Sequence, residues 1–101
     1  MPCQSPLSLE LSAPAKDDLR DIAQYTFVSH GERQVDIYLQ SLYDGMELLT
    51  ENPKIGHRRD DIPAGYEALN VEKHLLIFTI RDNAIVIARI LHQSRDMKRH
   101  F

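Results

Sequence analysis

The side chains best suited to acid–base or electrostatic chemistry gather at the C-terminal end of the sequence. The ten residues from His92 to Phe101 contain three basic side chains and two histidines, the densest positive cluster in the chain. An imidazole can exchange a proton near neutral pH, and a guanidinium or ammonium group can hold an anionic partner. We therefore expect this tail, together with two arginines of a central loop, to contact a target. The candidate target-binding residues are Arg58, Arg59, His92, Arg95, Lys98 and Arg99.

The balance of charge argues against one class of function. The chain of 101 residues contains 12 Lys and Arg against 15 Asp and Glu, a formal net charge of −3. Residues 1–53 hold nine acids and three bases, whereas residues 54–101 hold six acids and nine bases. Because a nucleic-acid binder is usually basic, we expect no direct sequence-specific binding of nucleic acid by this chain alone. Electrostatic contact with a target is expected in the second half.

No metal, redox or membrane function is indicated. The single Cys3 cannot form an internal disulfide, and a reducing cytoplasm is its simplest location. His74 and His92 come close across a predicted hairpin, but two imidazoles without a nearby thiolate or carboxylate make a poor metal site. We interpret them as structural. The first residues lack the features of a secretory signal, and no apolar run is long enough for a membrane span. We expect a cytoplasmic protein with no cofactor and no metal.

Two amphipathic helices are predicted to follow a short strand. Leucines alternate with polar residues over 7–11, a pattern typical of a strand with one buried face. Ser12 can cap a helix, whose apolar spacing of three and four continues until Gly31. The apolar positions of this helix are Ala15, Leu19, Ile22, Ala23 and Phe27. A second helix with the same spacing ends before Pro53.

The second half of the chain is predicted to form strands after a loop. Residues 53–65 contain two Gly, two Pro and five charges, a composition typical of a connection. Strands begin at Tyr66, and Asp82-Asn83 suits a two-residue hairpin turn because both residue types tolerate positive φ. This turn pairs Phe78 with Ile87, and Leu76 with Arg89. One face of the hairpin then carries Leu76, Phe78, Ile80, Ile85, Ile87 and Leu91, and the other Leu75, Ile77, Val86 and Ile90.

These strands are apolar on both faces, and one helical hairpin can cover only one face. Leaving the other in water would forgo about 1.5 to 3 kcal/mol for each large aliphatic side chain. The cover is either the first strand, the 53–65 loop or the tail of this chain, or another protein. We favour another protein. Arg89, a charge inside an apolar strand, either contacts this partner or forms a structural ion pair with Glu72 or Asp96. The predicted partner-binding residues are Leu75, Ile77, Val86, Arg89 and Ile90.

Six groups of residues, in this order and at this spacing, resemble the ParE branch of the ParE/RelE toxin family. The likeness extends from Leu7 to about Arg99. The groups are Leu11-Ser12 with Ala15, Asp18-Leu19, Ile22 and Tyr25-Thr26; Asn52-Pro53-Lys54-Ile55-Gly56; Gly65-Tyr66; His74-Leu75-Leu76-Ile77-Phe78; Arg89-Ile90-Leu91-His92; and Arg95-Asp96.

The resemblance implies the toxin of a bacterial toxin–antitoxin pair, neutralised by a ParD-like antitoxin that binds the second sheet face. ParE-like toxins inhibit DNA gyrase by protein–protein binding, so the resemblance implies no catalytic residues. RelE-like toxins instead cleave messenger RNA on ribosomes, and this alternative would use His92, Arg95 and His100. In those nucleases a tyrosine follows the arginine, and Phe101 occupies that position here. A third alternative, a non-toxic antitoxin-binding homologue, is suggested by Glu67, where many ParE-like sequences carry arginine.

We therefore predict a single α+β domain over residues 1–101. A strand and a helical hairpin pack on an antiparallel sheet of three or four strands. Residues 1–6 form a leader whose order the sequence leaves open, and residues 93–101 form a basic tail.

Overall fold

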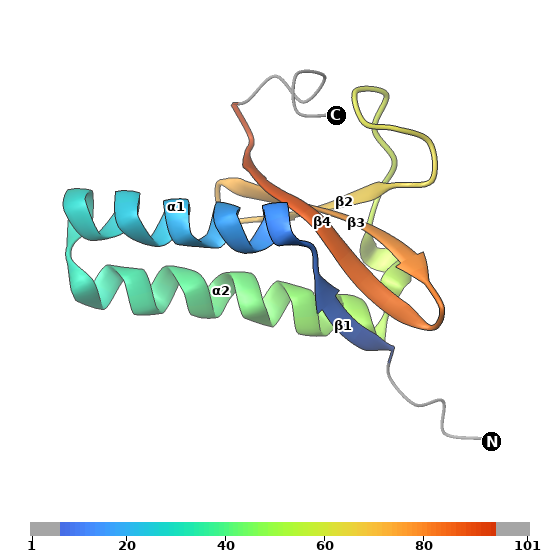
Figure 1. Cartoon of the computed structure of the whole chain (residues 1–101), viewed down its shortest axis with the longest axis horizontal. Coiled ribbons are helices and arrows are strands. Elements are labelled where there is room, and N and C mark those ends of the chain that lie inside the picture. Colours follow the sequence, from blue (N-terminus) through green and yellow to red (C-terminus); the bar gives the residue numbers. More distant parts are fainter. Residues whose placement is uncertain (1–6, 95–101) are drawn as a thin grey trace.

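The computed structural model describes residues 7–94, and in this range the chain packs two helices against a four-stranded sheet (Figure 1). The elements are β1 (Ser8–Leu11), α1 (Ala13–His30), α2 (Glu32–Glu51), a 3-10 helix η1 (Pro53–Ile55), β2 (Glu67–Val71), β3 (His74–Arg81) and β4 (Ala84–His92). The leader 1–6 and residues 95–101 of the predicted tail lie outside the described residues.

The helices begin and end where local chemistry requires it. Ser12 is the N-cap of α1, because its side-chain oxygen accepts a hydrogen bond of 3.1 Å from the Ala15 N–H. Gly31 separates the two helices with a φ of 91°, a value that favours glycine. Asn52 ends α2, and its side chain accepts a hydrogen bond of 3.3 Å from the Lys54 N–H at the start of η1. The predicted ends of the helical hairpin are confirmed.

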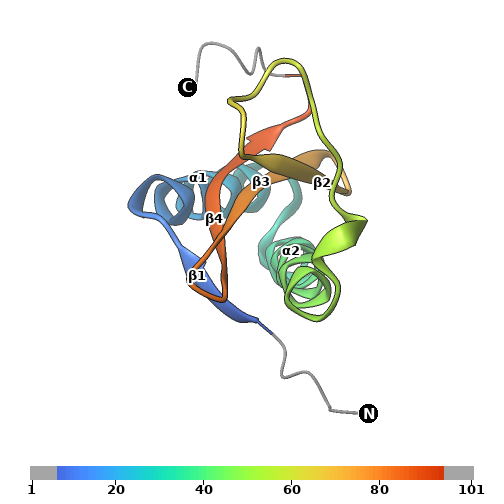
Figure 2. The ribbon, with the colours of Figure 1, turned by 90° about the vertical axis from the view of Figure 1, so that its right-hand side faces the viewer.

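The sheet has the strand order β1-β4-β3-β2, so β1 and β2 are its edges within residues 7–94 (Figure 2). β2, β3 and β4 are antiparallel neighbours, whereas β1 runs parallel to β4. The turn between β3 and β4 is formed by Asp82 and Asn83, with φ values of 51° and 66°, as predicted. The α+β class is confirmed, and the sheet is mixed because of β1.

An irregularity in β4 makes half of the predicted register wrong. Phe78 pairs with Ile87, as predicted, but Leu76 pairs with Ile90 instead of Arg89. One extra residue, Ala88, is inserted in β4 between the two parts of the ladder. Because side chains alternate between faces, a shift of one residue moves every later side chain to the opposite face.

The shift exchanges the predicted faces of two apolar residues. Ile90 was predicted on the same face as Leu75 and Ile77, and it is instead 2% exposed in the cluster beneath the helices. Leu91 was predicted on the face of Leu76 and Phe78, and it packs on the opposite face, 4% exposed. A bulge depends on how the strand meets its neighbours, so the alternation of apolar residues could not indicate it.

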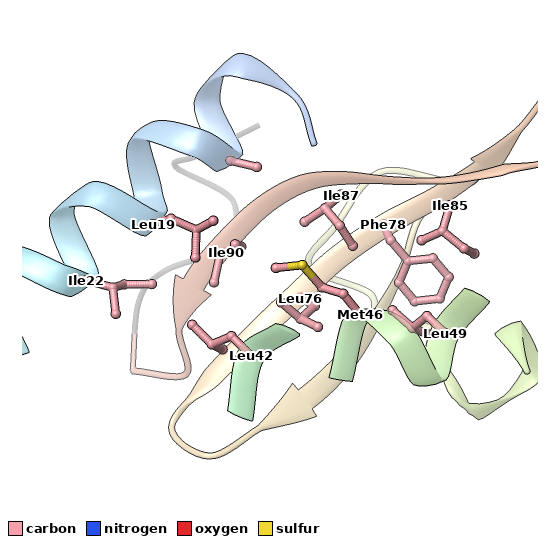
Figure 3. Close-up of a cluster of buried hydrophobic side chains, with 11 residues drawn as sticks. Leu19, Ile22, Leu42, Met46, Leu49, Leu76, Phe78, Ile85, Ile87 and Ile90 are labelled. Atoms are coloured by element: carbon pink, nitrogen blue, oxygen red, sulfur yellow. The ribbon is translucent and has the colours of Figure 1, made fainter. Parts of the chain in front are cut away.

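The larger apolar cluster fills the space between the helices and the sheet (Figure 3). Its buried members are Ala15, Leu19, Ile22, Leu42, Met46, Leu49, Leu76, Phe78, Ile85, Ile87 and Ile90. The stripe of α1 differs from the prediction at one position, because Thr26 is buried and Phe27 is 55% exposed. Thr26 lies four residues after Ile22 on the same line of the helix, whereas Phe27 is rotated away from it.

The second face of the sheet is covered by the chain itself. Ile62, from the loop before β2, is 7% exposed and packs with Ala68, Leu75, Ile77 and Leu91 in a separate cluster. The partly buried Tyr66 joins this cluster. The loop was one of the open alternatives. The preferred prediction, an exposed face awaiting another protein, is wrong for this part of the sheet.

Candidate functional site

The Asp18 carboxylate of α1 binds the backbone of β4 just beyond the point where β1 ends. Asp18 is 9% exposed, and its Oδ2 accepts a hydrogen bond of 2.9 Å from the Ile90 N–H. The Arg89 side chain donates from Nε to Oδ2 at 2.9 Å and from its Nη2 to Oδ1 at 3.0 Å. The guanidinium therefore binds both carboxylate oxygens in the bidentate geometry that favours strong pairing. The hydrogen bond to Asp18 raises the pKa of Arg89.

A structural ion pair of Arg89 is observed, and it is formed with Asp18, which was not among the predicted partners. Of those predicted partners, Asp96 lies outside the described residues. The side chains of Arg89 and Asp18 are 23% and 11% exposed. We therefore assign Arg89 to the scaffold that joins α1 to β4.

The other predicted partner-binding residues do not form one open surface. Leu75 and Ile77 are 1% and 0% exposed beneath the 53–65 loop. Ile90 is buried on the opposite face, under the helices. Val86 is partly exposed. A partner can reach Leu75 and Ile77 only by displacing the loop, and their contact with an antitoxin stays a prediction.

A phenol and two imidazoles are in contact at the end of the β3–β4 pair. His74 and His92 are directly paired across the strands, as their predicted proximity required, and their ring centroids are 5.2 Å apart in edge-to-face geometry. The Tyr38 hydroxyl lies 2.6 Å from His74 Nδ1 and accepts a hydrogen bond of 3.1 Å from the Lys73 N–H. Tyr38 and His74 lie 36 residues apart in the sequence, so only the fold brings them together.

The hydrogen bonds of this cluster fix the orientation of both rings. Burial raises the pKa of Tyr38, so its hydroxyl stays protonated, and it shares a hydrogen bond with His74 Nδ1. His92 Nδ1 accepts a hydrogen bond of 3.1 Å from the Ser94 N–H and lies 2.8 Å from the Ser94 hydroxyl. Because a backbone N–H can only donate, Nδ1 of His92 is the acceptor of the hydrogen bond from Ser94. Ser94 ties His92 to the start of the tail.

The structure divides the predicted target-binding residues. Arg58 is exposed in the loop. Arg59 forms two hydrogen bonds of 2.8 and 2.7 Å with Asp61, which raise its pKa. His92 lies at the end of β4. The remaining three, Arg95, Lys98 and Arg99, lie outside the described residues.

The loop and the end of β4 are brought together by packing. Ile62 of the loop and Leu91 of β4 belong to the same buried cluster. Both views place the loop and the end of β4 on the same side of the sheet (Figures 1 and 2). The charged loop therefore lies near the point where the basic tail begins, as a common target surface requires.

Sequence reasoning missed a groove at the other edge of the sheet. This groove, of about 680 Å³, is open to solvent and lies between β1, α1 and Tyr43 of α2. Leu9 and Tyr43, 38% and 45% exposed, stand at its sides. The sequence contained one signal for it, namely that Tyr43 lies off the buried stripe of α2.

Within residues 7–94, no group of three His, Cys, Asp or Glu side chains could hold a metal ion. Among the helices described here, none combines the length and the apolar character that crossing a bilayer requires.

The arrangement of two helices on this four-stranded sheet is that of known toxin structures. The chain superimposes on a chromosomal ParDE toxin–antitoxin system from P. aeruginosa with a TM-score of 0.75 and 23% identity, over 85% of this chain and 95% of that one. The RelBE2 toxin–antitoxin complex from Mycobacterium tuberculosis gives 0.64 and 20%, over 87% and 99%. YafQ from E. coli strain BL21(DE3) gives 0.61 and 24%, over 87% and 94%. The fold is therefore the one shared by ParE, RelE and YafQ toxins.

Sequence comparison narrows this class to one family. The family model of the ParE toxin of the type II toxin–antitoxin system, parDE, matches residues 9–97. Toxin ParE1 of Mycobacterium tuberculosis (strain H37Rv) is 32% identical over 91 residues, which cover 89% of this chain and 93% of the relative. Toxin ParE1 of Caulobacter vibrioides is 31% identical over 90 residues, with the same coverage. The chain belongs to the ParE toxin family of type II toxin–antitoxin systems.

Proposed function

We propose that this toxin inhibits DNA gyrase by protein–protein binding and is neutralised by a ParD-like antitoxin in the cytoplasm. The observation that carries the proposal is the match to the ParE family over residues 9–97, together with relatives named Toxin ParE1. The resemblance to ParE-like gyrase inhibitors seen in the sequence supplies the target. The proposed mechanism needs no catalytic residue and no cofactor.

An antitoxin partner is supported by the systems that share the fold. The matching family model names the parDE pair, and the similar structures include ParDE, RelBE2 and DinJ–YafQ systems. In each of these a toxin is paired with an antitoxin, and we extend that arrangement to this chain.

Target contact is proposed at the surface that contains the 53–65 loop and the end of β4. Arg58 is exposed there, and His92 is fixed by Ser94 at the beginning of the tail. The charge of Arg59 is partly satisfied by Asp61, so we expect Arg58 and the tail residues Arg95 and Lys98 to contribute more to binding.

The test measures supercoiling and message integrity with the same purified protein. We expect the chain to block supercoiling of a relaxed plasmid by gyrase, and to leave messenger RNA intact on translating ribosomes. The double variant Arg95→Ala/Lys98→Ala should weaken inhibition while antitoxin binding is retained. Arg33→Ala, an exposed arginine of α2 outside this surface, is the matched control and should inhibit normally. Supercoiling that continues unchanged in the presence of the protein would refute the proposal.

A ribonuclease remains the second candidate because of the contact between Tyr38, His74 and His92. Grouped phenol and imidazole side chains can act in proton transfer. If this candidate were correct, ribosome-bound message would be cut, and His92→Gln would abolish cutting while gyrase stayed active.

The non-toxic alternative rests on Glu67, which lies on β2 opposite Phe78. Expression of the chain alone in a bacterium separates the two readings. Arrested growth is the result expected of a toxin, and normal growth at a comparable protein level would favour an inert homologue.

A further inference from the structure

Two large aliphatic side chains of α2 face solvent on one line of the helix. Ile37 and Leu48 are 51% and 53% exposed. Single exposed apolar residues are common on protein surfaces, so their arrangement decides whether they matter. Successive residues of an α-helix are turned by about 100°, which places Ile37 and Leu48 within about 20° of each other and about 16 Å apart along the axis.

Four polar residues lie on the same line and complete a continuous strip. All of its members are exposed, they are spaced by three or four residues, and they fall within an arc of about 80°. The members of this outer strip of α2 are Arg33, Ile37, Gln40, Asp44, Leu48 and Glu51. The buried side chains of α2, such as Leu42 and Met46, lie on the opposite side of the helix. Figures 1 and 2 show no described element against the side of α2 that faces away from α1 and the sheet.

The order of residues in the outer strip is complementary to its own reverse. It begins with a base and ends with an acid, with an apolar residue next to each. If a second copy of α2 ran antiparallel to the first about a two-fold axis, Arg33 would face Glu51 of the second copy, and Ile37 would face Leu48. Gln40 would face Asp44 in the same way. These three pairs are centred on Leu42 or just after it, so a single axis satisfies all of them.

The polar centre of the strip also suits such a pair. Gln40 Nε2 donates a hydrogen bond of 2.9 Å to Asp44 Oδ1 of the same helix. An amide group carries a second N–H, which can donate to the Asp44 carboxylate of the second copy. Each Asp44 would then face a glutamine of the second copy, and the two carboxylates would not face each other. Near the end of the strip, the exposed Glu47 lies about one turn before Glu51, so Arg33 of the second copy would meet two acids.

We propose that two copies of this chain associate through the outer strips of α2, as an antiparallel helix pair about a two-fold axis. Spacings of three and four residues are those of the seams along which helices pack. The seam from Arg33 to Glu51 is about 27 Å long and contains only two kinds of apolar side chain, so the dimer is weak and depends on concentration. Neither Arg58 nor His92 belongs to the strip, and the inference does not depend on the proposed function.

Sedimentation equilibrium of the purified full chain, from about 1 µM to 1 mM, measures the association. We expect a dimer and no larger species, because a two-fold axis uses the strip of both copies. Ile37→Lys should weaken the dimer by about tenfold or more, since the apolar contact is lost twice. The matched control is Tyr25→Lys, at an apolar residue of α1 that is 71% exposed, and it should leave the association unchanged.

Exchange of charge tests the antiparallel arrangement. Arg33→Glu or Glu51→Arg places like charges opposite each other twice in a dimer, and each should weaken it by about threefold to tenfold. In a mixture of the two variants, every position 33 again faces an opposite charge at position 51, so a mixed dimer should form with the affinity of the wild type. Within one chain these positions are about 27 Å apart, so no internal contact can produce this rescue. Both substitutions suit the charge at their own end of the helix, and the variants should fold.

Three outcomes would overturn the inference: a monomer up to about 1 mM, a dimer that Ile37→Lys leaves intact, or a mixture of the two charge variants that associates no more tightly than each alone. Because gyrase is absent from this assay, its result is independent of the supercoiling test. A dimer with these properties, together with supercoiling that continues, would uphold the α2 interface and reject gyrase as the target. The reverse pair of results would reject only the interface.

Discussion

Removal of the Asp18 carboxylate should be one of the most damaging single changes to the fold. Asp18→Ala takes away the acceptor of the buried Ile90 N–H, and an unsatisfied buried donor costs about 1 to 3 kcal/mol. It also leaves Arg89 without this carboxylate, and breaking a buried pair costs about 3 to 5 kcal/mol. Since Arg89 is 23% exposed, water compensates part of the loss. The two costs overlap, because both arise from loss of the same carboxylate, and they are not added. We expect the free energy of unfolding to fall by about 3 kcal/mol.

Asp17→Ala is the matched control for this change. Asp17 is the preceding residue of α1, and it forms an ion pair with Arg20 on the surface, where the side chains are 67% and 73% exposed. Such a pair contributes about 0.2 to 1 kcal/mol. Unfolding in urea, followed by circular dichroism, measures both variants under the same conditions. Asp18→Ala should also lower the melting temperature by about 12 to 24 °C, at 4 to 8 °C for each kcal/mol. Equal stability of the two variants would refute the role assigned to Asp18.

Three further changes test other parts of the packing. Gly45→Ala should lower the free energy of unfolding by about 1 kcal/mol in urea, because a Cβ would lie 2.6 Å from Val71 Cγ2; a more stable variant would contradict this contact. Ile62→Ala should cost about 2 kcal/mol in the same assay, and a loss below about 0.5 kcal/mol would mean that the loop does not seal the second sheet face. Burial raises the pKa of Tyr38 above 10.0, so its neutral form stabilises the fold below that pH, and this stability is lost as the pH rises through the folded pKa. Unfolding at pH values on both sides of 10.0 should therefore show a smaller alkaline loss for Tyr38→Phe than for the wild type, and equal losses would contradict the shift.

The features that the sequence predicted correctly are governed by nearby residues. Ser12 caps the helix that starts beside it, and Gly31 ends that helix. Asp82 and Asn83 form the hairpin turn because their own backbones accept positive φ. The order of elements and the family resemblance followed from the same local patterns.

The features that it did not predict depend on residues far apart in the chain. Asp18 meets Arg89 across 71 positions, and nothing in the neighbourhood of either residue indicates the other. The extra residue Ala88 in β4 depends on how β1 ends, since the Ser12 hydroxyl donates a hydrogen bond of 2.7 Å to Ala88 O. The cover over Ile77 depends on the path of a loop with little regular structure. The groove beside β1 likewise exists only when three separate elements come together.

The edge of β4 beyond β1 is protected by side chains, whereas the outer edge of β1 is open within the described residues. An open strand edge invites pairing with other chains, so proteins usually protect it. β4 extends beyond the end of β1, and there its edge is protected by Ser12 and Asp18, which occupy the backbone groups a further strand would have used. The outer edge of β1 contains no proline, and within the described residues it carries no bulge. Within the described residues, the fold therefore protects the edge of β4 beyond β1 and leaves the outer edge of β1 open beside an apolar groove.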